Sequence, residues 1–226
     1  MAKVILIVGD TGTGKSTAIK TLNPDETFII NCLNKPLPFK GSKNLYNSEK
    51  KNIHVTEDWK VVLTLLDNVS KQSHIKNIVL DDISFAATKE FFNRASEIGY
   101  NKFTEIGVHT QAIIDKCKNL GDNINVILNY HEDDDISDKI KVGKKVKLIG
   151  MMLEDKYNPI SIVSVCLFTE VTWDKDNKPV FNFITQRTKT NTGQLIPAKS
   201  PDGMFDSIRI PNDLKLVIEK MNEYYN

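Results

Sequence analysis

The sequence lacks several features that define large classes of proteins. No apolar stretch approaches the roughly 20 residues that a membrane-spanning helix needs, which argues against a membrane protein. The three cysteines, Cys32, Cys117 and Cys166, are odd in number and far apart. They fit neither a disulfide framework nor a zinc site, so we expect a reducing, cytoplasmic environment. Arginine is also scarce, with three residues in the chain, which argues against the arginine-rich lid of a small-molecule kinase.

The rest of the composition is ordinary for a globular protein. The chain has 226 residues, of which 40% are hydrophobic and 26% charged, and its formal net charge is +1. That length is sufficient for one substantial core. A net charge near zero does not exclude nucleic acid as a partner, because a local basic patch can bind it. We expect a single domain over residues 1–226, with a core over 1–135 and a loop and β-hairpin extension over 136–226.

Hydrophobic periodicity predicts strands that alternate with helices along the first 130 residues. The expected strands cover 3–8, 27–33, 77–80 and 125–130, and the expected helices cover 16–22, 58–70, 85–98 and 103–120, with a polar loop over 34–52. This alternation predicts an α/β fold with a mainly parallel sheet flanked by helices. Further along, strand-like runs over 162–171 and 179–187 predict an antiparallel β-hairpin, and a closing helix follows Pro211.

The segment GDTGTGKS at 9–16 matches the phosphate-binding loop pattern G-x-x-x-x-G-K-[ST] between a predicted strand and a predicted helix. Its glycines allow positive φ angles and let successive backbone N–H groups approach an anion. Lys15 then supplies a charge to the β- and γ-phosphates, and the Ser16 hydroxyl ligates Mg²⁺. A dinucleotide site is disfavoured, because Thr17 stands where its third glycine is needed. We therefore expect ATP and Mg²⁺ to bind here. The expected nucleotide-binding residues are Gly9, Asp10, Thr11, Gly12, Thr13, Gly14, Lys15, Ser16 and Thr17.

The strand at 77–80 ends in two acids, Asp81 and Asp82. An apolar strand that ends in an acid, about 65 residues after a phosphate-binding loop, predicts a Walker B strand whose Asp81 holds the magnesium with Ser16. Asp82 has two readings of equal weight. It is either a catalytic acid that orients the attacking water or a cap for the next helix.

His131 follows the apolar run NVILNY, and we expect it at the carboxyl edge of the sheet, where ligands bind in open α/β folds. It is either a catalytic sensor of the γ-phosphate or a strand-end histidine with a structural role. A zinc protease is disfavoured, because the H-E-x-x-H pattern would require a histidine at Asp135.

Several cations are candidates for contacts with nucleic acid or with a neighbouring subunit. Five lysines lie close together after a short acidic run, namely Lys139, Lys141, Lys144, Lys145 and Lys147. They either neutralise the phosphates of single-stranded DNA or form the solvated face of a hairpin. Tyr100, Lys102 and Phe103 form a weaker aromatic–basic cluster. Arg187 and Lys189 alternate along a strand and are either surface charges or cations supplied in trans to the γ-phosphate.

Together these motifs resemble bacteriophage RecA-like P-loop ATPases, AAA-type nucleotide-binding proteins that include single-strand annealing recombinases. The resemblance rests on GDTGTGKST, NIVLDDISF, the strand closing in His-Glu, the hairpin and the late AKSPDGMFDSIRIPNDL, and it covers nearly the whole chain. It implies a RecA-like core that binds ATP and Mg²⁺ and forms a homo-oligomeric ring or filament. It also implies action on single-stranded DNA in phage recombination or replication, in the cytoplasm of the bacterial host. DNA-binding loops are expected at 99–106 and 133–147.

One departure from that family concerns turnover. RecA itself has a catalytic glutamate after the strand that follows the phosphate-loop helix, whereas TFIINCLNK contains none. Hydrolysis is therefore expected to be slow or to depend on Asp82. Two functions stay open on the sequence: a DNA-stimulated ATPase of strand annealing, and a nucleotide-switched binding module with little turnover. The second would act on a partner such as a single-strand-binding protein.

Overall fold

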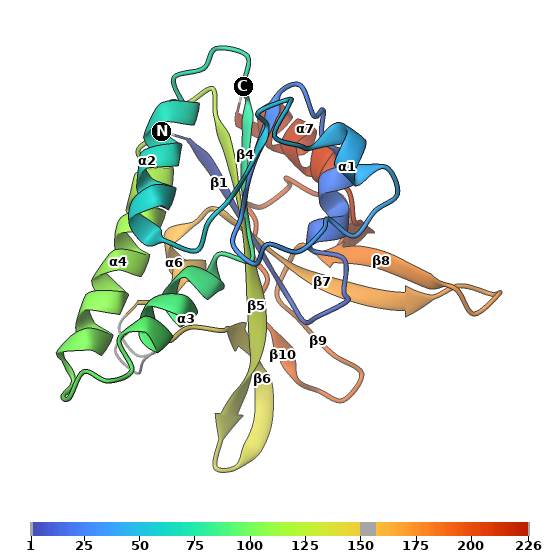
Figure 1. The fold of residues 1–226 in the computed structure, drawn as a ribbon. Coiled ribbons are helices and arrows are strands. Elements are labelled where there is room, and N and C mark those ends of the chain that lie inside the picture. The colour runs from blue at the N-terminus through green and yellow to red at the C-terminus, as the bar shows by residue number, and fades with distance from the viewer. Residues whose placement is uncertain (1, 150–156, 226) are drawn as a thin grey trace. The chain divides into compact units, whose positions relative to one another are not determined.

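The computed structural model describes residues 2–149 and 157–225, and it confirms the α/β class: a mixed, mostly parallel sheet flanked by helices (Figure 1). The chain forms two compact units that alternate along the sequence. The first contains residues 2–4, 23–129, 148–149 and 157–158, and the second contains 5–22, 130–147 and 159–225. This division does not follow the expected boundary between residues 135 and 136. The single-domain organisation stays a prediction.

The first unit contains a parallel sheet of buried strands. Its order is β3 (Ile53–Val55), β2 (Thr27–Asn31), β4 (Asn77–Asp81) and the first half of β5 (Asn125–Ser137). Every residue of β2 and β4 is buried, which explains their nearly continuous apolar runs. In the register of the sheet, Asn31 pairs with Asp81. The carboxyl ends of β2 and β4 therefore meet at one edge of the sheet.

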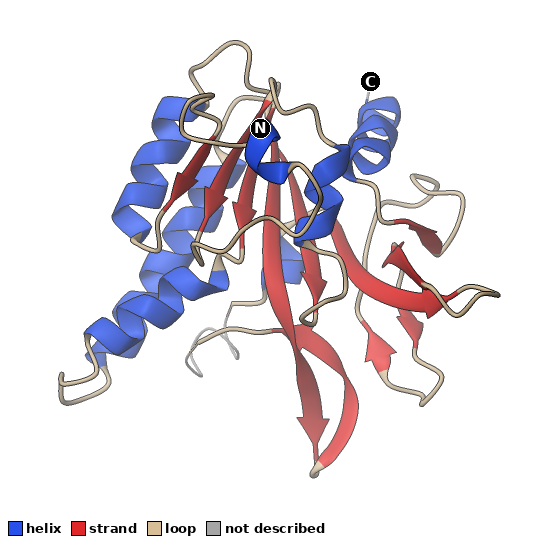
Figure 2. Ribbon diagram, turned by 45° about the vertical axis from the view of Figure 1, so that its right-hand side comes forward, coloured by secondary structure: helices blue, strands red, loops and turns tan. Residues whose placement is uncertain are grey.

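Three longer helices accompany these strands. They are α2 (Trp59–Val69), α3 (Ser84–Asn93) and α4 (Asn101–Lys118), and α2 and α3 each pack against α4 (Figure 2). The carboxylate of Asp58 caps α2 by accepting a hydrogen bond from the Lys60 amide at 2.8 Å.

Within the expected loop over 34–52 the structure places a short helix, α1 (Ser42–Leu45). Among the described helices, none combines the length and apolar character required to cross a membrane.

Lys102, a member of the expected aromatic–basic cluster, lies inside the protein and bonds the turn between α3 and α4. Lys102 is only 8% exposed, and its Nζ donates to the carbonyls of Arg94 and Ala95, both at 3.3 Å, and of Glu97 at 2.9 Å. It thereby satisfies carbonyls of the turn that follows α3. Because this ammonium is already bound inside the protein, it does not present a charge to nucleic acid.

The second unit is built around β1 (Lys3–Gly9), which pairs in parallel with β7 (Val165–Trp173). The antiparallel hairpin of β7 and β8 (Pro179–Ile184) is confirmed, and β11 (Arg209–Pro211) pairs antiparallel with β8. It follows that β11 runs in the direction of β1. Short helices η1 (Ser16–Thr21, a 3₁₀ helix) and α6 (Pro159–Ile162) and the expected closing helix α7 (Leu214–Tyr225) complete this unit.

A second hairpin extends β5 beyond the expected strand end. β5 continues to Ser137 and pairs antiparallel with β6 (Ile140–Val146), forming the long hairpin at the foot of Figure 1. β6 also pairs with β10 (Leu195–Ile196), which in turn pairs with β9 (Thr188–Lys189). The expectation that His131 ends a strand is therefore wrong, because the chain remains extended for six more residues. The alternative reading of the lysine-rich segment, a hairpin, is confirmed.

Candidate nucleotide-binding site

The loop between β1 and η1 has the backbone that its glycines predict. Gly12 has a φ of 78° and Gly14 a φ of 102°, a region that residues with a Cβ rarely occupy. The loop is braced from within, because the Thr13 hydroxyl donates to the Asp10 carbonyl at 2.7 Å. The Asp10 carboxylate in turn accepts from the Thr11 amide at 2.7 Å. These hydrogen bonds within the loop help to fix its conformation.

Lys15 is buried beside this loop, with 6% of its surface exposed. Its Nζ donates to the carbonyl of Gly9 at 2.9 Å and to that of Asp10 at 2.8 Å. A buried ammonium held by carbonyls of its own loop can exchange these partners for phosphate oxygens with little rearrangement. Ser16, which follows it, is also buried and begins η1.

Three consecutive backbone donors in the loop have no partner of their own. Within the described part of the chain, the amides of Gly12, Thr13 and Gly14 make no hydrogen bond. Successive N–H groups in a loop with positive φ form an anion-binding nest. Together with the Lys15 ammonium, they supply the donors and the charge that a polyphosphate needs. The residues present therefore fit the triphosphate of ATP.

Strands β7 and β8 and the segment after β11 hold the loop from its other side. A Cβ on Gly9 would lie 1.7 Å from the Thr169 hydroxyl, and one on Gly14 would lie 2.9 Å from Cδ1 of Phe181 and 3.2 Å from Nδ2 of Asn212. Packing thus requires both glycines, and its positive φ is a second requirement for glycine at Gly14. Sequence reasoning missed Thr169, Phe181 and Asn212, because no local pattern shows that these later residues contact the loop.

In the first unit, the end of β4 carries the two expected acids. Asp81 is 1% exposed, and its Oδ1 accepts from the Asn129 side-chain amide at 2.8 Å. Asp82 is equally buried, adopts a φ of 57°, and forms an ion pair with Lys35 at 2.5 Å. Helix α3 begins at Ser84 with Ile83 at its N-cap and has no side-chain cap. The reading of Asp82 as the cap of this helix is therefore wrong, and its catalytic role stays a prediction.

The neighbouring end of β2 shows what replaces the missing glutamate. Asn31 bonds its own loop, donating from Nδ2 to the Lys35 carbonyl at 2.8 Å and accepting from the Leu33 amide at 3.1 Å. Burial, and then the charge of Asp81, raises the pKa of the Cys32 thiol well above its usual range. An amide and a protonated thiol hold no proton acceptor comparable to a carboxylate. The carboxylates that act on Cys32 are Asp81 and Asp82, at and just after the end of β4, and Glu57, which follows β3.

Magnesium would be held by few protein groups. Among the described residues, no three histidine, cysteine or acidic side chains gather into a metal-binding cluster. Mg²⁺ commonly keeps several waters and takes one or two protein ligands together with substrate phosphates. Ser16 and Asp81, the expected metal ligands, are both buried, and their role at the metal stays a prediction.

The lysine-rich hairpin is largely neutralised by its own acids. Lys144 pairs with Glu132 at 2.9 Å and with Asp134 at 3.1 Å, and Lys141 pairs with Asp134 at 2.6 Å. The hydrogen bonds that Asp134 accepts, from Lys141 above all and then from Lys144, lower the pKa of its carboxyl group. The hydrogen bond that Lys144 donates to Glu132 raises the pKa of Lys144. Residues 132–147 carry five acids and five lysines, so their formal charges cancel. Within the described chain, Lys139 and Lys147 are exposed and form no ion pair.

The remaining predicted residues lie elsewhere in the second unit. His131 is half-buried in the middle of β5, where its carbonyl accepts from the Lys147 amide at 2.8 Å. Arg187 and Lys189 are exposed, and neither forms an ion pair with another described residue. The structure thus brings together the loop residues 9–17, whereas the roles assigned to His131, the lysines and this pair stay predictions.

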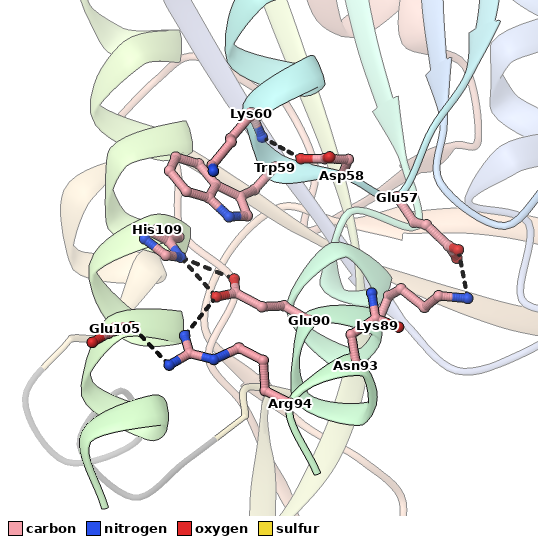
Figure 3. A pocket seen from close by; sticks show the side chains of 10 residues that line it. All are labelled: Glu57, Asp58, Trp59, Lys60, Lys89, Glu90, Asn93, Arg94, Glu105 and His109. Carbon is pink, nitrogen blue, oxygen red and sulfur yellow. Dashed lines mark hydrogen bonds and ion pairs between the residues drawn. The ribbon is translucent and has the colours of Figure 1, made fainter. Parts of the chain in front are cut away.

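The first unit also holds a charged pocket that the sequence did not indicate (Figure 3). Its cavity volume is about 710 Å³. The rings of Trp59 and His109 stack with centroids 3.7 Å apart, and His109 Nδ1 lies 2.9 Å from a Glu90 carboxylate oxygen. Arg94 pairs with Glu90 at 3.1 Å and with Glu105 at 2.7 Å. Arg94 is thus enclosed by carboxylates, and the cluster is a structural network that joins α2, α3 and α4.

The sheet, the flanking helices and the phosphate-binding loop define the class as an α/β P-loop NTPase. A family profile described as an AAA domain matches residues 1–201. The chain belongs to this family of AAA-type P-loop ATPases. A search of curated proteins gave no match.

Proposed function

We propose that the protein binds ATP with Mg²⁺ at residues 9–17 and hydrolyses it to ADP and phosphate. The observation that supports this most strongly is the loop itself, where three consecutive amides find no partner in the part of the chain that the structure describes and lie next to the buried Lys15. Mg²⁺, held by Ser16 and Asp81, would neutralise charge on the β- and γ-phosphates. Lys15 would stabilise the charge that develops on the γ-phosphate as an in-line water attacks.

Turnover is proposed to be slow. The end of β2 offers Asn31 and Cys32 in place of a glutamate, and the Asp82 carboxylate is paired with Lys35. The Lys35 ammonium occupies the Asp82 carboxylate, so Asp82 becomes an effective water-positioning residue only when Lys35 moves away. Residues proposed for catalysis are therefore Lys15, Asp82 and, as a phosphate sensor, His131.

The finer proposal is action on single-stranded DNA in phage recombination or replication, with ATP controlling assembly of a homo-oligomer. It rests on the resemblance to phage RecA-like ATPases and on exposed cations in the second unit, of which Lys139, Lys147, Arg187 and Lys189 form no ion pair among the described residues. Arg187 or Lys189 would reach the γ-phosphate of a neighbouring subunit.

A second candidate is a nucleotide-switched module that binds a replication partner, such as a single-strand-binding protein, with little turnover. The Asp82–Lys35 pair and the charge-balanced hairpin both favour it, because the first occupies the candidate catalytic carboxylate and the second reduces attraction to DNA. In this case the bound triphosphate, rather than its hydrolysis, carries the signal.

Steady-state ATPase rates with and without single-stranded DNA separate these candidates. For the DNA-stimulated ATPase we expect a slow basal rate that rises at least tenfold with DNA, and no rate above background for Lys15→Ala. A rate that DNA leaves unchanged, with ATP binding intact, would instead identify the switch. Activity that persists fully in Lys15→Ala would contradict both, since neither allows hydrolysis without this ammonium.

A further inference from the structure

Two side chains outside the 9–17 segment contact the phosphate-binding loop at Gly14. Phe181 Cδ1 and Asn212 Nδ2 lie 2.9 Å and 3.2 Å from the position that a Cβ of Gly14 would occupy. Phe181 belongs to β8, and Asn212 directly follows β11. Since β11 runs in the direction of β1, Asn212 and the loop both follow the carboxyl ends of their strands. Ligands of open α/β folds bind at that edge.

The backbone around Asn212 is firmly held. Its amide donates to the Phe181 carbonyl at 3.2 Å, which ties it to β8. On the other side, the Thr21 hydroxyl at the end of η1 accepts from the Leu214 amide at 3.0 Å. The Asp213 carboxylate accepts from the Leu216 amide at 3.1 Å and caps α7. The backbone contacts on both sides therefore fix the position of the Asn212 side chain, without a hydrogen bond from its side-chain Nδ2 to any described residue.

That amide is a buried donor without an acceptor. Among the described residues, Asn212 Nδ2 is inaccessible to solvent and has no hydrogen-bond partner. The nearby Asn182 amide shows the usual arrangement, because its Nδ2 donates to the Thr172 hydroxyl at 3.0 Å and to the Val180 carbonyl at 3.3 Å. Buried polar groups are almost always paired, so an unpaired donor beside a ligand loop indicates that the ligand supplies the acceptor.

We propose that Phe181 and Asn212 form the nucleoside end of the nucleotide site, which rests on the proposed ATP binding at residues 9–17. The phosphates already have donors in Lys15 and the loop amides, whereas an aromatic ring offers them nothing. A nucleoside needs both groups: the half-buried Phe181 ring covers an apolar face, and Asn212 Nδ2 donates to an acceptor on the base or ribose. Asn212 thereby becomes a specificity-determining residue for nucleotides over bare polyphosphate.

Calorimetric titration with Mg²⁺·ATP and with Mg²⁺·tripolyphosphate tests this assignment. We expect Asn212→Leu to weaken ATP binding about tenfold, the effect of losing one ligand hydrogen bond, and to leave tripolyphosphate within about twofold of wild type. Asn212→Asp is expected to lose as much, because a carboxylate cannot donate, and it keeps the size of the side chain if the leucine variant does not fold. Phe181→Leu should weaken ATP about threefold. The matched control is Asp213→Asn, which keeps a capping side chain and should bind ATP as wild type does.

The outcomes separate this inference from the proposed function. ATP affinity that is unchanged in folded Asn212→Leu or Asn212→Asp overturns the nucleoside assignment while ATP binding stands. An equal loss for ATP and tripolyphosphate also overturns it, because the amide would then serve the phosphates. Failure of the wild-type chain to bind ATP contradicts the proposed function itself, and the inference fails with it.

Discussion

The phosphate-binding loop of the second unit and the charged pocket of the first unit treat their polar groups in opposite ways. In the pocket, Arg94 is paired with three carboxylates, and these bonds, that with Glu97 first, raise the pKa of its guanidinium. In the loop, the amides of Gly12, Thr13 and Gly14 have no partner among the described residues, and the Lys15 ammonium donates to the carbonyls of Gly9 and Asp10. The pocket is a large, visible cavity, but a ligand anion would have to compete there with the carboxylates that already hold Arg94. The chemistry of the donors is therefore a better indicator of a phosphate site than cavity volume.

The largest expected effect comes from adding one methyl group to the loop. Gly14→Ala introduces a Cβ at a φ of 102° and 2.9 Å from Phe181, so we expect about 3 kcal/mol of lost stability and more than tenfold weaker ATP binding. Gly12→Ala is the matched control, since its Cβ meets nothing within 4 Å and only the backbone strain of about 1 kcal/mol applies. Urea unfolding and calorimetry measure both quantities. Equal losses in the two variants would contradict the packing of Gly14 against Phe181.

Cysteine labelling compares the two units within one protein. Burial raises the pKa of Cys166 in the second unit and brings that of Cys117 in the first to about 12, so neither reacts until its unit opens. Nucleotide at about 100 times its Kd should slow the labelling of Cys166 by up to about 100-fold and affect Cys117 less. Because folding raises these pKa values, the stability they contribute is complete below the ordinary thiol pKa of about 8.5 and declines as the pH rises above it. Mass spectrometry of the labelled peptides gives both rates, and equal protection would show that the units open together.

A mutation in the charged pocket should lower the stability of the protein and leave its affinity for ATP unchanged. Glu90→Leu removes the carboxylate that Arg94 and His109 share, so we expect a loss of about 1–2 kcal/mol in the free energy of unfolding. The Kd for ATP should stay within about twofold of wild type. Urea unfolding and calorimetry on the same variant decide the matter, and a tenfold weaker Kd would show that this pocket belongs to the ligand site after all.

The smallest expected effect is the salt dependence of binding to single-stranded DNA. If only Lys139 and Lys147 are available from the hairpin, log K should fall with log salt with a slope of about −1.4, whereas five free lysines would give about −3.5. Fluorescence anisotropy of a labelled oligonucleotide over a salt series measures the slope. A value near −3.5 that disappears when both lysines are changed to glutamine would contradict the internal pairing of the hairpin.

The parts of the fold that the sequence predicts are those specified by local pattern. The strand, loop and glycines at 3–16 and the apolar strand ending in Asp81 are recognisable because each depends on neighbours in the chain. The full length of β5 cannot be recognised from the sequence, because its outer half is polar and is stabilised by cross-strand pairs such as Lys144 with Glu132. A run of acids followed by a run of lysines carries no apolar alternation, so periodicity fails there.

The candidate site shows the same limit. Lys15 and Gly14 follow from a contiguous motif, whereas Phe181 and Asn212 reach the loop only through the pairing of β8 with β7 and β11. Lys102 illustrates the opposite error: a basic residue between aromatics indicates nucleic acid in sequence, but in the fold its ammonium bonds the turn after α3. Contacts of this kind depend on tertiary structure and carry no local signal.

The most direct test of the account follows the backbone amide resonances of Gly12, Thr13 and Gly14 in ¹⁵N-labelled protein during titration with Mg²⁺·ATP. We expect large shifts at these three amides that saturate with a single Kd, and little change at Glu90, Arg94 and His109 around the charged pocket. Resonances of the loop that do not move at saturating nucleotide, or shifts concentrated at the pocket, would contradict the claim that this nest of unpaired donors receives the polyphosphate.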